Sequence, residues 1–213
     1  MTKKKPKKGA SVNVTRSRRE RKREYLEPDE INRLLEVART GEATRNPVRN
    51  YALLLVTFLH GLRASELCNL RVSDVDLKRR VLYVPRLKNG KPAEHPIKAA
   101  IQKPFRAHNE LKAIQDWLTV RESIKPETTH LFISEQRRGL SRQNMALLVG
   151  KIAEAAGLGK LAVHGHMLRH SLGYHLVNKG VNIRVVQEYL GHRRIESTVI
   201  YTAINPARFN EIL

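Results

Sequence analysis

The sequence His166-Met167-Leu168-Arg169-His170, followed by Leu190-Gly191-His192 and then by Tyr201, decides the fold and the chemistry of this chain. A second stretch with an arginine, Gly61-Leu62-Arg63-Ala64-Ser65-Glu66-Leu67, lies about 100 residues upstream. A guanidinium is a planar fork of donors that fits two phosphate oxygens. An imidazole exchanges a proton near neutral pH, and tyrosine is an established covalent nucleophile. The combination predicts chemistry on a phosphodiester with tyrosine as the nucleophile.

The composition points to nucleic acid as the partner. The chain has 213 residues, 41% of them hydrophobic, and a formal net charge of +20. This length suits one domain with an appendage, and a strong positive charge favours a densely negative partner. The sequence has no apolar run of about 18 residues, so we expect no membrane span, and no secretory signal peptide is recognisable. The single cysteine, Cys68, excludes an intrachain disulfide, fits the cytoplasm, and is expected in the core.

The N-terminal segment is strongly basic and poor in large apolar residues. Residues 1–24 hold 11 Lys or Arg and two Glu, so their net charge is 11 − 2 = +9. Such a segment cannot bury enough apolar surface to fold alone. We therefore expect residues 1–25 to be a disordered basic arm that lies along DNA phosphates. Residues 26–213 are expected to form one compact catalytic domain.

Periodicity and capping signals predict helices in the first third of the chain. A helix is expected to begin at Pro28, with acidic residues in its first turn. Asn46 and Pro47 read as the N-cap and the first-turn proline of a second helix that runs to about Leu59. A short helix is expected over residues 64–70.

The middle of the chain changes to a strand pattern. Val81–Val84 is β-branched and aromatic, Asn89-Gly90 is a hairpin signal, and Glu94–Ile97 is the expected return strand. We expect a fold that is mainly α with a small three-stranded antiparallel sheet. The remaining helices are predicted at about 107–121, 141–156, 166–179, 182–189 and 195–203.

Cleavage of a phosphodiester without a metal requires several side chains together. Negative charge that develops on the phosphate must meet fixed positive donors, the nucleophile must lose a proton, and the leaving oxygen must gain one. Arg63 and Arg169 are expected to supply the donors and Tyr201 the nucleophile. His166 and His192 are placed to orient the phosphate and to manage protons.

The proton donor and the nucleophile each have alternatives. Lys88, at the tip of the predicted hairpin, can donate to the leaving oxygen, but Lys91 lies in the same turn. Tyr174 and Tyr189 are alternative nucleophiles, although neither follows Leu-Gly-His by nine residues as Tyr201 does.

The motifs resemble those of the tyrosine recombinases, also called phage-type integrases. The family pattern Gly-Leu-Arg-x-Ser-Glu-Leu stands at residues 61–67, Leu-x-x-x-Asp at 70–74, His-x-Leu-Arg-His at 166–170, and Leu-Gly-His with Tyr nine residues on at 190–201. The resemblance covers roughly residues 26–213. It implies the tyrosine recombinase catalytic-domain fold.

Some stretches are especially similar to the small fimbrial phase-variation recombinases of enteric bacteria. They are Phe58–Glu66, Arg86-Leu87-Lys88 and His166–Ser171. Those recombinases invert a promoter-bearing DNA element and lack a separate N-terminal core-binding domain. The resemblance implies the same absence here, so the arm or a partner protein would have to supply the missing grip on DNA.

The resemblance also implies roles for individual residues. By this resemblance, Arg63 and Arg169 bind the scissile phosphate, and His192 hydrogen-bonds it. His166 transfers protons, and Lys88 is the general acid. Tyr201 forms the 3′-phosphotyrosine, and Glu66 supports the pocket. No cofactor and no metal is implied.

The implied partner is double-stranded DNA with inverted-repeat sites, bound by a homotetramer on paired sites, with possible DNA-bending accessory proteins and no membrane. The implied location is the cytoplasm, on the bacterial nucleoid.

Several alternative functions remain open at the level of sequence. A non-catalytic DNA-binding regulator would explain the charge but not the Arg, His, Tyr pattern. A type IB topoisomerase shares the nicking chemistry, and an integrase of a mobile element differs only in its substrate. His166 and His170 have a spacing that can bind zinc, yet the H-E-x-x-H pattern and paired cysteines are missing.

Overall fold

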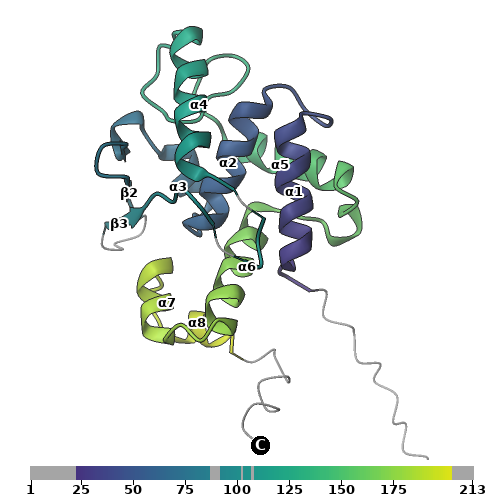
Figure 1. Cartoon of the computed structure of the whole chain (residues 1–213), viewed down its shortest axis with the longest axis vertical. Helices are drawn as coiled ribbons and strands as arrows, with labels where there is room; N and C mark the ends of the chain where they lie inside the picture. Colours follow the sequence, from purple (N-terminus) through teal and green to yellow (C-terminus); the bar gives the residue numbers. More distant parts are fainter. Residues whose placement is uncertain (1–22, 87–91, 102, 107, 203–213) are drawn as a thin grey trace, which may run out of the picture.

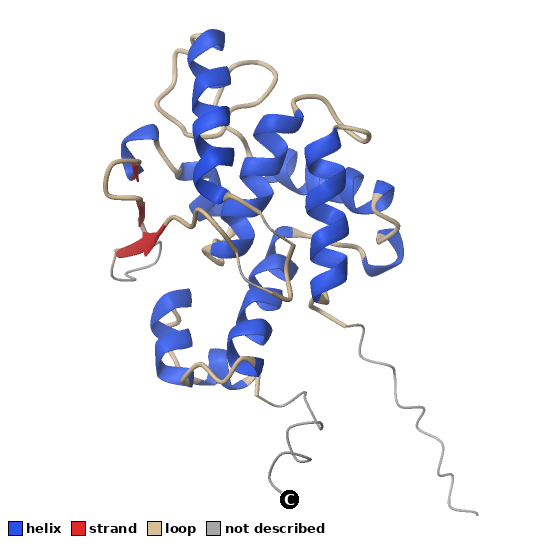
Figure 2. Ribbon diagram, viewed as in Figure 1, coloured by secondary structure: helices blue, strands red, loops and turns tan. Residues whose placement is uncertain are grey.

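A computed structural model of the chain describes residues 23–86, 92–101, 103–106 and 108–202 (Figure 1). Its described part is mainly helical, with one small sheet at an edge of the molecule (Figure 2). The elements in chain order are α1 (Pro28–Thr40), α2 (Pro47–Leu59), α3 (Ala64–Asn69), η1 (Val72–Asp74), β1 (Val75–Asp76), β2 (Val81–Val84), β3 (Ala93–Pro96), α4 (Glu110–Ile124), α5 (Arg142–Ala155), η2 (Gly159–Leu161), α6 (Gly165–Asn178), α7 (Ile183–Leu190) and α8 (Glu196–Val199).

Helix α2 is the centre of the core because it is apolar on nearly all sides. It packs against α1, α4 and α6, and its residues from Ala52 to Phe58 are all buried. A helix that is hydrophobic all round has to be covered on every face. Its C-terminal end, at His60 and Gly61, therefore lies inside the molecule rather than at the surface.

The sheet confirms the predicted three-stranded antiparallel arrangement. The strand order is β1-β2-β3, and Leu82 pairs with Val75 on one side and with His95 on the other. Leu82 and Val84 are fully buried, so alternate residues of β2 face the core as the period of a strand requires. The return strand is shifted by one residue from the predicted Glu94–Ile97, and the Asn89-Gly90 turn lies outside the described residues.

Some helix boundaries differ from the predictions. Asn46 does not cap α2 with its side chain; it lies in the left-handed region at φ 59° and its Nδ2 donates to Glu135 Oε1 at 2.7 Å. The helix expected from residue 107 begins at Glu110, because Asn109 is its N-cap and accepts from Lys112 N at 2.8 Å. The helix expected over residues 195–203 is the single turn α8.

Helix α6 connects the core to α7 and α8, which lie at one end of the molecule in Figure 1. Gly191 ends α7 in the left-handed conformation, φ 65°, which glycine adopts without the steric cost of a Cβ. Cys68 is buried with the core residues, as predicted. No described helix combines the length and the apolar character that crossing a membrane requires.

Candidate active site

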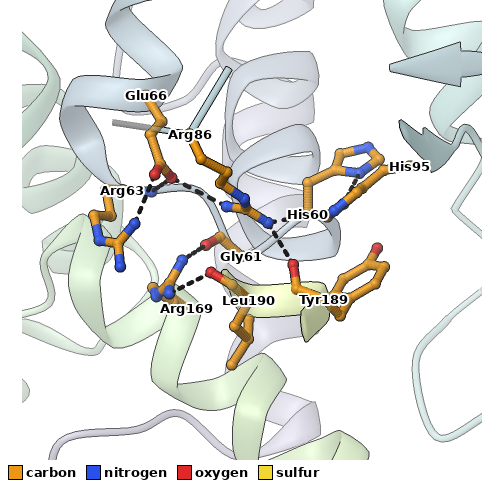
Figure 3. Close-up of polar contacts among 9 residues, drawn as sticks. All are labelled: His60, Gly61, Arg63, Glu66, Arg86, His95, Arg169, Tyr189 and Leu190. Atoms are coloured by element: carbon orange, nitrogen blue, oxygen red, sulfur yellow. Dashed lines mark hydrogen bonds and ion pairs between the residues drawn. The ribbon is translucent and has the colours of Figure 1, made fainter. Parts of the chain in front are cut away.

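Arg169 is the most deeply buried of the predicted phosphate-binding residues. It lies on α6, and its side chain donates to the carbonyl oxygens of Gly61 at 2.5 Å and of Leu190 at 2.6 Å (Figure 3). These carbonyls lie where α2 and α7 end, where helices leave acceptors unpaired and favour positive charge. Since a guanidinium has five N–H donors, three of those on Arg169 remain for a further ligand. Arg169 thus joins two segments and still offers donors.

Arg63 and Glu66 are fixed to each other at the start of α3. Arg63 Nη1 donates to Glu66 Oε1 at 2.7 Å, and the Arg63 backbone N–H donates to Glu66 Oε2 at 2.9 Å. The side chain of Arg63 is 34% exposed, whereas that of Glu66 is fully buried. Glu66 therefore orients Arg63, the more accessible of the two predicted arginines.

A third arginine, Arg86, lies in the same cluster, and the sequence reasoning assigned it no role. Its Nη1 donates to Glu66 Oε2 at 3.2 Å, and its Nη2 donates to the Tyr189 carbonyl and approaches His95 Nε2 at 3.3 Å. Its side chain is fully buried. A signal was present in the sequence, since Arg86 comes two residues after the apolar strand β2, but its partners lie on three other elements.

The cluster carries an excess of positive charge. Among the described residues, Glu66 is the one carboxylate hydrogen-bonded to these arginines, so three positive charges and one negative give a net +2. Burial and the charge of Arg63 lower the pKa of Arg169 to about 10. A phosphodiester, with one negative charge, would offset half of this excess and accept hydrogen bonds from the arginines.

Tyr201 follows α8, and its ring is surrounded by other aromatic side chains. Its centroid lies 5.4 Å from that of Tyr174, 5.6 Å from His170 and 6.2 Å from His192. Tyr201 is 1% exposed. Burial raises the pKa of its phenol, while the positive charges of Arg169 and Arg63 oppose that rise. The phenol therefore lies within the field of the arginine cluster.

Both predicted catalytic histidines also lie within that field. Burial, with Arg169 as the next cause, lowers the pKa of His166 and lowers that of His192 to about 3. The Nδ1 atom of His192 is 2.8 Å from Thr198 Oγ1 on α8. Both imidazoles are therefore neutral near pH 7, and a bound phosphate would favour their protonation.

The structure brings six of the predicted residues into one region: Arg63, Glu66, His166, Arg169, His192 and Tyr201. Lys88 and its alternative Lys91 lie outside the described residues.

Of the two alternative nucleophiles, Tyr189 is engaged elsewhere, whereas Tyr174 lies beside Tyr201. Tyr189 Oη donates to the Leu59 carbonyl at 2.8 Å, and the ring of Tyr174 packs on that of Tyr25 at 4.1 Å. His170 lies between the rings of His166 and Tyr201. Asp74 caps a turn by accepting from Arg71 N at 2.8 Å. Within the described ranges, no group of three or more His, Cys, Asp or Glu residues is arranged to hold a metal ion.

Residues 24–208 match the model of the phage integrase family. The chain belongs to this family. It is a tyrosine-type site-specific DNA recombinase, and DNA is its substrate. The resemblance seen in the motifs is thereby confirmed.

Two fimbriae regulatory proteins of Escherichia coli (strain K12) match this recombinase over most of their length. It is 43% identical to the type 1 fimbriae regulatory protein FimB over 190 residues, which is 89% of this chain and 88% of FimB. It is 36% identical to the type 1 fimbriae regulatory protein FimE, covering 88% of this chain and 89% of FimE.

Solved recombinase structures share the fold. The crystal structure of XerA recombinase superposes with a TM-score of 0.71 at 30% identity, and the match covers 88% of this chain but 63% of XerA. XerH, in its post-cleavage complex with the difH substrate, superposes with a TM-score of 0.70 at 24% identity over 88% of this chain and 52% of XerH. The predicted tyrosine recombinase catalytic-domain fold is confirmed.

Proposed function

We propose that this recombinase inverts a promoter-bearing DNA segment between inverted-repeat sites and so controls fimbrial phase variation. Its similarity to two fimbriae regulatory proteins along nearly their whole length supports this substrate. The segment lies on the bacterial chromosome, so the enzyme works in the nucleoid.

The proposed chemistry assigns each site residue one step. The Tyr201 hydroxyl attacks the scissile phosphorus, a bond forms between Tyr201 Oη and phosphorus, and the bond to the 5′-oxygen breaks. Arg63 and Arg169 donate to the phosphate oxygens as negative charge develops on them. His166 takes up the phenolic proton, and His192 hydrogen-bonds the phosphate.

The leaving oxygen needs a proton, and Lys88 is the proposed donor. The products are a 3′-phosphotyrosine and a free 5′-hydroxyl. Because one phosphoester replaces another, the energy of the bond is retained and no external energy source is needed. A 5′-hydroxyl from the partner site then attacks the phosphotyrosine and releases Tyr201.

Exchange between two sites requires several copies of the enzyme. Each recombination site has two strands to cut and rejoin, so two paired sites call for four copies, and we propose a homotetramer. The basic arm, residues 1–25, adds contacts to DNA phosphates, and DNA-bending accessory proteins bring the two sites together.

The observation that carries the chemical part of the proposal is the surroundings of Tyr201. Its ring lies 6.2 Å from that of His192, and the positive charges of Arg169 and Arg63 act to lower the pKa of its phenol. These residues come from α3, α6, the end of α7 and the segment after α8. The proposed nucleophile, the two proposed phosphate-binding cations and the imidazole proposed to hydrogen-bond the phosphate are therefore neighbours although they are distant in sequence.

An inversion assay tests the biological part. A supercoiled plasmid would carry a reporter promoter between inverted repeats from the chain's own genome, beside a matched plasmid with direct repeats. We expect inversion of the first plasmid, read by restriction digestion. Relaxation without rearrangement would indicate a topoisomerase, and insertion into a second plasmid would indicate an integrase. Either result would contradict the proposal.

A further inference from the structure

A row of buried polar side chains begins at Arg86 and leads away from the active site. His95 Nε2 is 3.3 Å from Arg86 Nη2, His95 Nδ1 is 3.2 Å from His60 Nδ1, and His60 Nε2 is 2.5 Å from Glu110 Oε1. His60, His95 and Glu110 are 0%, 2% and 0% exposed. Figure 3 shows the end of this row nearest the active site, where Arg86 lies between Glu66 and the two histidines.

The direction of each hydrogen bond in this row is determined. A guanidinium only donates, so His95 Nε2 must accept from Arg86. A neutral imidazole has one donor and one acceptor, so His95 Nδ1 carries the proton and donates to His60 Nδ1. The remaining nitrogen, His60 Nε2, then donates to the Glu110 carboxylate. The row therefore runs one way from a cation to an anion through two neutral histidines.

The far end of the row is well anchored. Glu110 is the first residue of α4, where the helix dipole favours a negative charge. Its other oxygen, Oε2, accepts from the Lys98 backbone N–H at 2.9 Å. The His95 ring also stacks on the Tyr189 ring with centroids 4.1 Å apart. Packing and charge thus hold His95 in the orientation that presents Nε2 to Arg86.

The near end of the row contacts two segments that carry site residues. Arg86 Nη1 donates to Glu66, the carboxylate that orients Arg63. Its Nη2 donates to the Tyr189 carbonyl at the end of α7. The neighbouring Leu190 carbonyl accepts from Arg169. The guanidinium of Arg86 therefore lies between the groups that position Arg63 and those that position Arg169.

The turn after α7 fits closely against the same guanidinium. A Cβ added at Gly191 would lie 2.8 Å from Arg86 Nε. At that distance Arg86 or the turn would have to shift to admit a side chain. His192 follows Gly191 directly, so the place of Arg86 also constrains where the turn presents His192.

We propose that Arg86 is a positioning residue for strand cleavage, held in place by the one-way row of hydrogen bonds through His95 and His60 to Glu110. It fixes the distance between Arg63 and the end of α7 that carries His192. This inference rests on the proposed roles of Arg63, Arg169 and His192.

Rate and affinity measured together test the proposal. The single-turnover rate of covalent adduct formation and the Kd for the same DNA site would be compared in Arg86→Met and in Arg79→Gln, an exposed arginine on the turn between β1 and β2. A misplaced catalytic group costs about 100-fold in rate, and this is the loss we expect in Arg86→Met, with Kd nearly unchanged. The control Arg79→Gln is expected to match the wild type.

A pair of substitutions at His95 separates positioning from mere packing. His95→Gln keeps an acceptor for Arg86, whereas His95→Leu has similar bulk and no acceptor. We expect the rate to fall about tenfold in His95→Leu, as for one lost hydrogen bond, and to be largely retained in His95→Gln. Equal rates in the two variants, or parallel losses of rate and DNA affinity in Arg86→Met, would overturn the proposal.

A spectroscopic measurement on the wild type needs no variant to fold. In ¹⁵N-histidine NMR at neutral pH, we expect His95 protonated on Nδ1 alone and His60 on Nε2 alone. The opposite tautomers, or an imidazolium at either position, would contradict the one-way row. A wild type that forms no adduct would refute the proposed function instead, so the two failures are distinguishable.

Discussion

Gly173 leaves the space that the ring of Tyr201 occupies. A Cβ at this position of α6 would lie 2.5 Å from ring atoms of Tyr201. The ring of Tyr201 can lie against α6 because the helix has no side chain at position 173. The single turn α8 that precedes Tyr201 is short, so the tyrosine is the partner that would move.

Alanine at Gly173 is predicted to displace Tyr201 and to slow adduct formation by about 100-fold, the cost of misplacing a reacting group. The change should not lower helix stability, because alanine favours a helix over glycine by about 1 kcal/mol. Gly150→Ala is the matched control, since Gly150 lies inside α5 with no atom within 4 Å of an added Cβ. A control with equally reduced cleavage, or an unaffected Gly173→Ala, would contradict this account.

Sequence motifs predict the site at the level of single residues only in part. Arg63, Arg169 and Tyr201 stand in motifs whose residue types already suit phosphodiester chemistry, and they meet in the structure. Arg86 and His95 were missed because Arg86 is a single arginine just after β2 and His95 a single histidine within β3, and neither stands in a recognisable motif. Their importance depends on partners from α3, α2 and α7, which no local pattern reveals.

Elements with strong periodicity were predicted well. Helix α2 and strand β2 lie where the apolar pattern predicted them. Burial on nearly all sides of α2 requires a continuous apolar run, and burial of alternate residues in β2 requires a period of two, and both patterns can be recognised in the sequence. The start of α4 and the length of α8 were predicted poorly. The first depends on the Asn109 cap and on contacts with Lys98, and the second is a single turn held by tertiary contacts.

His95, which lies on β3 and packs against His60 and Tyr189, should make the free energy of unfolding depend on pH. Burial, with His60 and Arg86 as further causes, lowers the pKa of His95 from 6.5 to about 3. Below pH 6.5 the unfolded chain therefore binds a proton at His95 that the folded chain does not. The stabilisation is fully present above pH 6.5 and is lost progressively as the pH falls toward 3.

Replacement of His95 is predicted to reduce this pH dependence. Between pH 7 and pH 5 the titration of one such histidine lowers the free energy of unfolding by about 2 kcal/mol. Urea denaturation at both pH values would compare the wild type with His95→Gln, which cannot titrate in this range. The wild type should lose about 2 kcal/mol more than the variant. Equal losses would show that His95 is not buried in its neutral form.

On the scale of the whole molecule, charge is distributed unevenly along the chain. The net charge is +20, and residues 2–22 hold 10 Lys or Arg against one Glu, so 10 − 1 = +9 of it lies there. Arg23, the first described residue, bonds Glu30 on α1. Removal of residues 2–22 therefore keeps Arg23 and its bonds to Glu30.

The truncated chain is predicted to bind DNA with a weaker salt dependence. Each phosphate neutralised by Lys or Arg contributes a slope of about −0.9 to the plot of log K against log salt. Fluorescence anisotropy with one DNA site over a range of salt concentrations would measure both slopes. We expect a clearly shallower slope after truncation. An unchanged slope would show that the arm does not contact phosphates.

The central claim is that Tyr201 becomes covalently linked to DNA without a metal. The wild type and Tyr201→Phe would be incubated with supercoiled plasmid bearing the candidate sites in EDTA, quenched with SDS, and examined for protein-bound DNA. The account predicts a 3′-phosphotyrosyl adduct in the wild type and none in Tyr201→Phe, with equal DNA affinity, since one hydroxyl is removed. An adduct in Tyr201→Phe, or a wild type that binds the sites tightly without forming one, would contradict it.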